Sequence, residues 1–237
     1  MNSPFLPDKN QQTNILNAIS QLAKIFWGPD PESCRAMLDG TFLSPFEALG
    51  FFVADNAPGI FAELKACHAR FADPNALFEH LEALYINLFI NNRNGVIIPL
   101  YASCHTDGSA TGENASLMGP AAVEMKKRFK EAGLALGDDI REPPDHVSIE
   151  LEYLYFMLEK GWSDNDRELI AEASSFSGEI MLPWFTRLQD RLAVIEAEDP
   201  FYRLITVILD ALLHFIADLE PIADGDNSRH YKKTTPP

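Results

Sequence analysis

Apolar residues recur along this chain at the three- and four-residue spacing of helices, and this periodicity limits the fold more than any other feature. One stripe follows Ile15, Ile19, Leu22 and Phe26 and stops at Gly28, a residue typical of helix ends. Similar stripes lie within residues 77–89, 120–129, 182–195 and 201–219. No segment alternates between apolar and polar residues as a strand would. We therefore expect an all-α fold, a single-domain multi-helix bundle with long ordered loops.

The chain is long enough to bury one sizeable core, because 46% of its 237 residues are hydrophobic. The end of the chain from Asp224 onward is polar and finishes in prolines, which is typical of a flexible terminus. We expect one helical domain over residues 1–223 and a flexible tail over residues 224–237.

The formal net charge is strongly negative: 19 Lys and Arg residues face 35 Asp and Glu residues, which gives −16. Such a surface repels nucleic acids and anionic lipid and attracts cationic partners. We therefore expect no nucleic-acid partner and favour basic peptides or basic protein surfaces. Solubility alone also explains a charge of this size, so the partner class needs further support.

Three isolated cysteines, Cys34, Cys67 and Cys104, indicate a reducing compartment. Their odd number and the absence of a C-x-x-C pair argue against a disulfide framework and a zinc site. The N-terminal residues show no basic-then-apolar signal layout, and no run approaches the roughly 20 apolar residues of a membrane helix. We expect a cytoplasmic protein without stable membrane insertion.

One long stretch, residues 91–119, shows no helical period. Long loops inside compact domains are usually functional or disordered. Residues 96–101 (VIIPLY) are too apolar for a plain disordered segment, which favours an ordered functional loop.

Residues 141–162, REPPDHVSIELEYLYFMLEKGW, place an acid and a histidine directly before a long apolar helix. Two prolines hold the chain extended before Asp145, which predicts that Asp145 caps the helix. His146 is exposed to two opposed effects, because the helix N-terminus disfavours its cation and the neighbouring Asp145 favours it.

The same helix divides into two faces. One stripe has the pattern of a core: Val147, Leu151, Leu154 and Leu158. The other changes from polar to apolar along its length and suggests the floor of a peptide-binding groove: His146, Glu150, Tyr153 and Met157.

Enzyme chemistry finds little support. Asp145 and His146 lack a nucleophile in a G-x-S-x-G or reactive-cysteine context, and no phosphate-binding glycine motif is present. Asp210, His214 and Asp218 recur every four residues, so a metal-dependent hydrolase using Asp210 and His214 is one alternative. We expect a protein that is not an enzyme and has no cofactor.

Residues 142–152, EPPDHVSIELE, resemble the signature of the TorD-like family of redox-enzyme maturation chaperones, which includes DmsD-like and NarJ-like branches. Three further segments are similar to family elements in the same order: LYINLF at residues 84–89, PLYASCH at 99–105 and LMG at 117–119. The resemblance covers roughly residues 77–215.

The resemblance implies an all-helical cytoplasmic chaperone that binds the twin-arginine signal peptide of a molybdenum-cofactor oxidoreductase. It would assist folding and cofactor insertion in the apo catalytic subunit and delay export, acting as a monomer or homodimer. The family positions it implies for peptide binding are Leu88, Phe89, Pro99, Tyr101, Ser103, Asp145 and His146. From their charge, Asp145 and Glu150 are candidates to bind the arginines. A helical adaptor without an export role is the remaining alternative.

Overall fold

The computed structural model describes residues 6–50, 57–91, 98–105, 117–137, 140–195 and 199–219, and these parts form an all-α structure. The fold class predicted from the periodicity is therefore confirmed. The α-helices are α1 (Lys9–Trp27), α2 (Pro31–Asp39), α3 (Ser44–Ala48), α4 (Ala57–Ala69), α5 (Pro74–Tyr85), α6 (Pro120–Glu131), α7 (Val147–Asp164), α8 (Arg167–Ser175), α9 (Leu182–Ala193) and α10 (Phe201–Ala217). Three short turns of other helix types are η1 (Ile86–Ile90), η2 (Ala102–His105) and η3 (Phe176–Met181).

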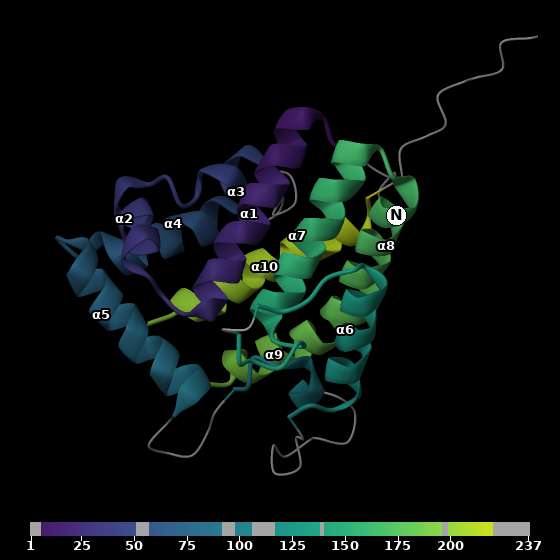
Figure 1. The fold of residues 1–237 in the computed structure, drawn as a ribbon. Coiled ribbons are helices and arrows are strands. Elements are labelled where there is room, and N and C mark those ends of the chain that lie inside the picture. Colours follow the sequence, from purple (N-terminus) through teal and green to yellow (C-terminus); the bar gives the residue numbers. More distant parts are fainter. Residues whose placement is uncertain are drawn as a thin grey trace, which may run out of the picture.

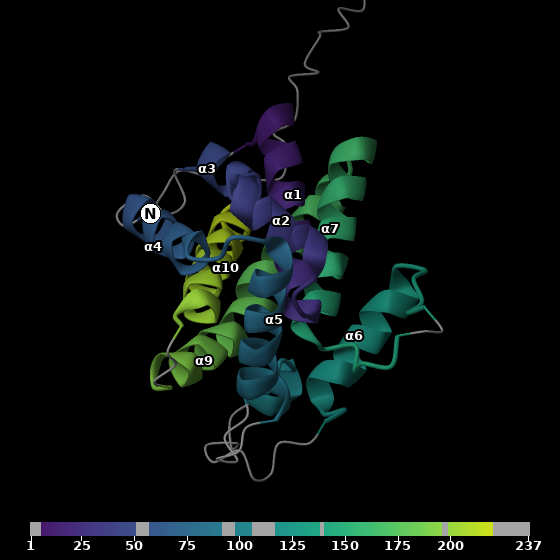
Figure 2. The same cartoon turned by 90° about the vertical axis from the view of Figure 1, so that its left-hand side faces the viewer.

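Helices α1 and α7 lie side by side through the middle of the molecule (Figure 1). Helices α2 to α5 lie on the α1 side, and α6 and α8 on the α7 side. The view turned by 90° again shows α3 and α4 on the α1 side and α6 on the α7 side (Figure 2). The apolar stripe from Ile15 to Phe26 is fully buried, as its spacing predicted. Helices α2 and α3 pack on α1, and α8 packs on α7, so this pair joins the two sides of the molecule.

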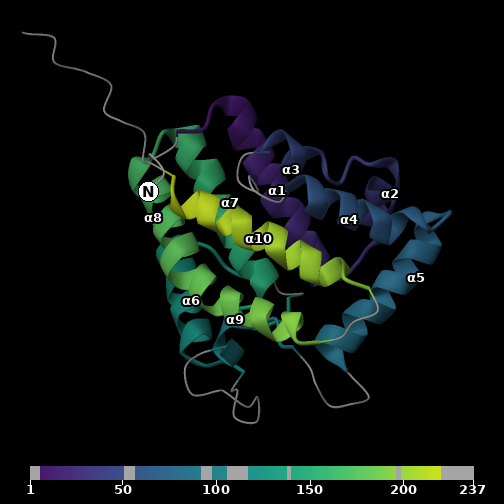
Figure 3. The same cartoon turned by 180° about the vertical axis from the view of Figure 1, so that it is seen from behind.

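Helix α10 crosses behind this pair and packs on α9, η3, α8 and α4 (Figure 3). Most of its residues are buried, so it is apolar around much of its circumference, as expected for a central helix. Asp199, just before α10, accepts bonds from Arg70 and His80 at 2.6 and 2.8 Å and from the Phe201 amide at 2.9 Å. This carboxylate ties α4 and α5 to the start of α10.

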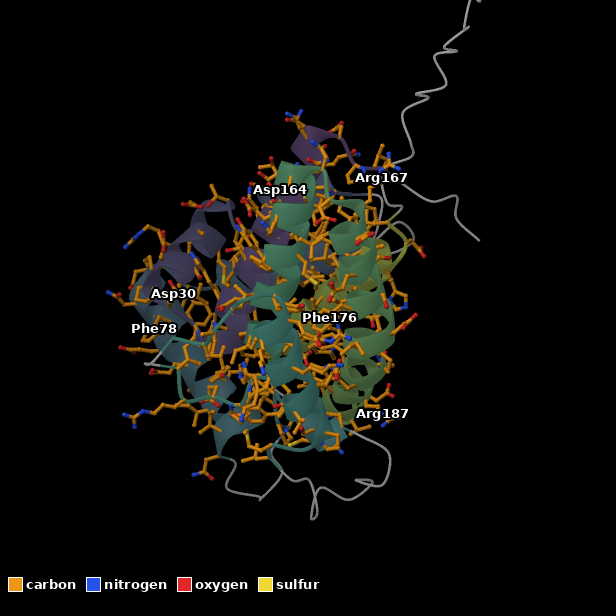
Figure 4. The ribbon with its side chains drawn as sticks, turned by 45° about the vertical axis from the view of Figure 1, so that its right-hand side comes forward. Asp30, Phe78, Asp164, Arg167, Phe176 and Arg187 are labelled. Carbon is orange, nitrogen blue, oxygen red and sulfur yellow. The ribbon has the colours of Figure 1, made fainter. Side chains whose placement is uncertain are left out.

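Phe176 shows how the second half of the chain is packed. Its ring meets Tyr153 of α7 edge to face at 5.2 Å between centroids, and the Arg128 guanidinium of α6 lies 5.4 Å from its centre. Figure 4 shows Phe176 among the interior side chains, whereas Asp164 and Arg167 mark the far end of α7 and the start of α8. Aromatic contacts of this kind stabilise the junction of three elements.

Local signals explain where the helices begin and end. Asp73 caps α5, accepting from the amides of Asn75 and Ala76 at 2.9 and 3.2 Å. Helix α1 ends at Gly28, whose φ of +122° suits glycine, and a Cβ there would lie 3.8 Å from the Tyr85 ring. This tight turn leaves Trp27 at the very end of α1.

Several expectations fall outside the described residues, namely the tail at 224–237 with its boundary, and positions 92–97 and 106–116 of the long loop. Within the described part, no helix combines the length and apolarity needed to cross a bilayer.

Candidate functional site

The segment 98–105 is fastened to the start of α7 by backbone hydrogen bonds. Tyr101 and His146 pair as an isolated antiparallel bridge. The Ala102 amide donates to the Asp145 carbonyl and the Val147 amide to the Leu100 carbonyl, each at 2.9 Å. Backbone hydrogen bonds therefore join the described part of the predicted functional loop to residues 144–146, the P-D-H segment.

Asp145 does not cap α7, in contrast to the prediction. The cap is His146, whose Nδ1 accepts from the Ser148 amide at 3.2 Å. Asp145 lies one residue further from the helix, where its Oδ2 accepts instead from the Ser103 amide at 2.8 Å. The Asp145 side chain is fully buried, so its role is to hold the 98–105 segment against α7.

His146 supports two aromatic rings near the surface. Its imidazole stacks on Trp27 with centroids 5.0 Å apart and meets Tyr101 edge to face at 5.2 Å. Burial lowers the pKa of His146 to about 4, because removal from water disfavours the cation. The ring is therefore neutral at pH 7, consistent with Nδ1 acting as a hydrogen-bond acceptor.

Glu150 lies deeper, one turn into α7, and is fully buried. Its Oε2 accepts from the Trp184 indole of α9 at 2.9 Å. Burial raises the pKa of Glu150 well above its usual range. The Trp184 bond lowers this pKa and the Asp145 charge raises it, but both effects are smaller than that of burial. This carboxyl group belongs to the interior polar network at the base of the site.

The predicted groove floor on α7 is wrong. His146, Glu150, Tyr153 and Met157 are each at most 3% exposed, which makes this face as buried as the core stripe opposite. Distant segments cover this face: Trp184 of α9 donates to Glu150, and its ring lies against His105 of η2, with the two ring centroids 5.6 Å apart. Neither Asp145 nor Glu150 reaches the surface to meet an arginine in this conformation.

The other predicted positions lie around this network. Pro99 accepts from His105 Nε2 at 2.7 Å through its carbonyl, so it belongs to the same segment as Tyr101 and Ser103. Leu88 and Phe89 belong to the π-helical turn η1 and are 5% exposed; the Leu88 carbonyl accepts from the Ile98 amide at 2.9 Å. Tyr101, Ser103, Asp145 and His146 are therefore in direct contact, whereas Phe89 packs apart from them on Tyr85 and Tyr202.

The accessible part of the site is a hollow of about 390 Å³ beside Trp27, the ring that stacks on His146. It is lined by Trp27, Ile140, Arg141, Glu142 and Glu152. The Trp27 indole donates to Glu152 at 2.7 Å, and the Tyr101 hydroxyl donates to Glu142 at 2.5 Å. Burial and this bond raise the pKa of Tyr101. We call this feature the rim hollow; it presents two carboxylates beside an indole ring.

Sequence reasoning did not identify Trp27, Ile140 or Glu152 as site residues. Trp27 and Glu152 are 125 positions apart, and their contact depends on the packing of α1 against α7. Two local features of the sequence point to this region. Trp27 directly precedes the glycine that ends α1, and Glu142 is the first residue of the TorD-like signature.

The alternative metal site on α10 gains no support. His214 Nδ1 lies 2.9 Å from the Asp210 carbonyl and 3.4 Å from its carboxylate, an ordinary contact along an exposed helix face. Among the described residues, no group of three His, Cys, Asp or Glu side chains is arranged to hold a metal ion.

Replacing Asp145 with alanine should destabilise the chain by about 1.5–3 kcal/mol, because the buried Ser103 amide loses a charged acceptor. Asp145→Asn keeps an acceptor oxygen at the same place and should cost clearly less. Urea unfolding of the three proteins provides the measurement. Equal losses in the two variants would contradict the anchoring role.

Comparison with known proteins adds independent information. Residues 55–190 match the family model described as nitrate reductase delta subunit. The chaperone protein TorD of Shewanella amazonensis is 26% identical over 124 residues, 52% of this chain and 49% of that protein. TorD of Histophilus somni is 25% identical over 142 residues, 59% of this chain and 66% of the relative. The chain therefore spans about half to two thirds of the length of these curated relatives.

A solved structure of a candidate redox enzyme maturation protein from Archaeoglobus fulgidus is 19% identical, with a TM-score of 0.49, over 90% of this chain and 98% of that one.

Proposed function

Since the chain belongs to the nitrate reductase delta subunit family, whose model it matches over more than half of its length, we propose that it is a chaperone for the maturation of a redox enzyme. Family membership agrees with the TorD-like resemblance of residues 142–152, and relatives carry the name chaperone rather than that of an enzyme. In finer terms, the chain binds the twin-arginine signal peptide of a molybdenum-cofactor oxidoreductase. It holds the apo subunit in the cytoplasm until the cofactor is inserted.

The main structural support for this proposal is the rim hollow. Glu142 and Glu152 place carboxylate oxygens beside the Trp27 ring at the surface of the molecule. A guanidinium group suits this combination, because it can bind carboxylates in bidentate fashion and can also stack on an indole. The net charge of −16 further favours association with a cationic segment.

In this proposal the predicted site residues have two kinds of role. Tyr101 orients Glu142 through its hydroxyl group, and His146 supports the Trp27 ring from beneath. Asp145 and Glu150 bind interior donors, the Leu88 carbonyl holds η1 against the segment that begins at Ile98, and Phe89 packs on Tyr85 and Tyr202. The rim hollow therefore depends on the signature residues without exposing all of them.

Co-purification with a client tests the proposal against the adaptor alternative. A tagged molybdenum-cofactor oxidoreductase subunit from the same organism, expressed without its cofactor, should retain this chain when its twin-arginine segment is present. The same subunit with the segment deleted should retain much less. Equal retention by both forms, or by neither, would contradict signal-peptide recognition.

A further inference from the structure

A second hollow adjoins the rim hollow along the seam between α1 and α7. It measures about 220 Å³ and is lined by Ile19, Ser20, Ala23, Lys24, Leu151, Glu152 and Tyr155. Glu152 belongs to both linings, so the two hollows meet at this side chain. We call the pair the α1–α7 track.

The two ends of the track differ in chemistry. The rim end has the indole and the two carboxylates described above. The seam end has an apolar floor of Ile19, Ala23 and Leu151, together with the exposed ring of Tyr155 one turn beyond Glu152. Its polar lining is limited to Ser20, Lys24 and the shared Glu152. The track therefore changes from acidic and aromatic to apolar along the direction of α7.

Two cationic residues also border the track. Lys24 lies at the seam, 3.9 Å from Glu32, and Arg141 lines the rim hollow. Neither Lys24 nor Arg141 prevents a ligand from reaching the carboxylates of Glu142 and Glu152. Within the described residues, the hydrogen bonds of these carboxylates come from Tyr101 and Trp27. Lys24 and Arg141 are suited to donate to the carbonyl groups of a bound extended backbone.

The pocket next to Leu88 is less suited to bind an arginine side chain. It holds only about 100 Å³ and is lined by Leu88, Leu192, Ile195, Asp199, Pro200 and Arg203. Its carboxylate, Asp199, is already bonded to Arg70, His80 and the Phe201 amide. An incoming arginine would have to displace these partners, whereas the track needs no such exchange.

We propose that a signal peptide lies along the α1–α7 track, with an arginine side chain in the rim hollow and the following apolar residues on the seam. This inference rests on the proposed function and adds the path and polarity of the bound segment. Charge complementarity determines the basic end, and the apolar floor accepts the hydrophobic end. Glu152 is then the residue that selects for arginine, and Tyr155 contacts the apolar part.

Matched variants on one helix test the path. Glu152→Gln removes a charge but keeps an oxygen for the Trp27 indole, whereas Glu159→Gln makes the same change two turns further along α7, outside both linings. Binding of a labelled twin-arginine peptide is measured by fluorescence anisotropy on the full chain. We expect Glu152→Gln to weaken binding about tenfold and Glu159→Gln to change it less than about twofold.

A second pair of measurements tests the apolar end. Tyr155→Ser should weaken a peptide with the full apolar run about fivefold, and a peptide whose apolar run is replaced by serine should lose this sensitivity. If the wild-type chain binds the peptide but Glu152→Gln behaves like Glu159→Gln, the track is overturned and the proposed function stands. If the wild-type chain binds no twin-arginine peptide, both are overturned.

Discussion

Acidification from pH 7 to pH 5 should withdraw about 2 kcal/mol of folding stability at each of two buried histidines, His105 and His146. Both rings are nearly inaccessible to water, and burial lowers the pKa of each to about 4 from an ordinary 6.5. Desolvation is the largest cause at both positions, and it also lowers the pKa of the buried His68, which contributes in the same direction.

The direction of the stability change depends on whether the folded or the unfolded chain binds more protons at a given pH. Below pH 6.5 the imidazoles of the unfolded chain become protonated, while those of the folded chain stay neutral until about pH 4. The unfolded state therefore binds more protons in this window, and stability falls as the pH falls. Glu150 acts in the opposite direction, because its raised pKa makes the folded chain hold a proton that the unfolded chain releases above its ordinary 4.5.

Variants separate these contributions. His146→Asn keeps a side-chain acceptor for the cap of α7 but cannot titrate, and His105→Gln keeps a donor for the Pro99 carbonyl. In urea unfolding at pH 7 and pH 5, each variant should lose about 2 kcal/mol less than the wild type on acidification.

Phe185→Leu provides the control, since it removes buried apolar volume without changing a titrating group. Its stability deficit should be the same at both pH values. If His146→Asn and His105→Gln also kept a constant offset from the wild type, the buried histidines would not be the source of the acid sensitivity.

The second large effect concerns the ligand. Replacing both arginines of a twin-arginine peptide by lysines should weaken binding by tenfold or more at constant net charge. A lysine ammonium keeps the positive charge but loses the planar donors that match a carboxylate and the flat surface that stacks on an indole. Both losses should weaken binding in the rim hollow, where the Trp27 ring lies beside the Glu152 carboxylate.

Salt provides a control for this comparison. General attraction to a chain of charge −16 is screened as ionic strength rises, so weak binding of the lysine peptide should decline steeply. The difference between the two peptides should persist, because it depends on shape and hydrogen bonding at short range.

Helix periodicity accounts for much of what could be predicted about the fold. The stripe from Ile15 to Phe26 and the stripe from Val147 to Leu158 are both buried, because amphipathic spacing reports directly on which face meets a core. The cap of α5 at Asp73 was also predictable, since capping depends on residues within one turn.

The incorrect predictions concern residues whose exposure depends on contacts between helices far apart in sequence. His146 and Glu150 have the polarity of a surface face, yet Trp27 and Trp184 cover them from α1 and α9. Those contacts join residues far apart in sequence, and periodicity within one helix carries no information about them. The accessible rim hollow was missed for the same reason, because Trp27 and Glu152 meet only after α1 has packed against α7.

Calorimetric titration of the purified chain with a twin-arginine peptide and its double-lysine counterpart tests the central claim most directly. We predict measurable, saturable heat with the arginine peptide and binding at least tenfold weaker with the lysine peptide at the same salt concentration. Equal heats for both peptides, or none for either, would contradict recognition of a twin-arginine signal peptide.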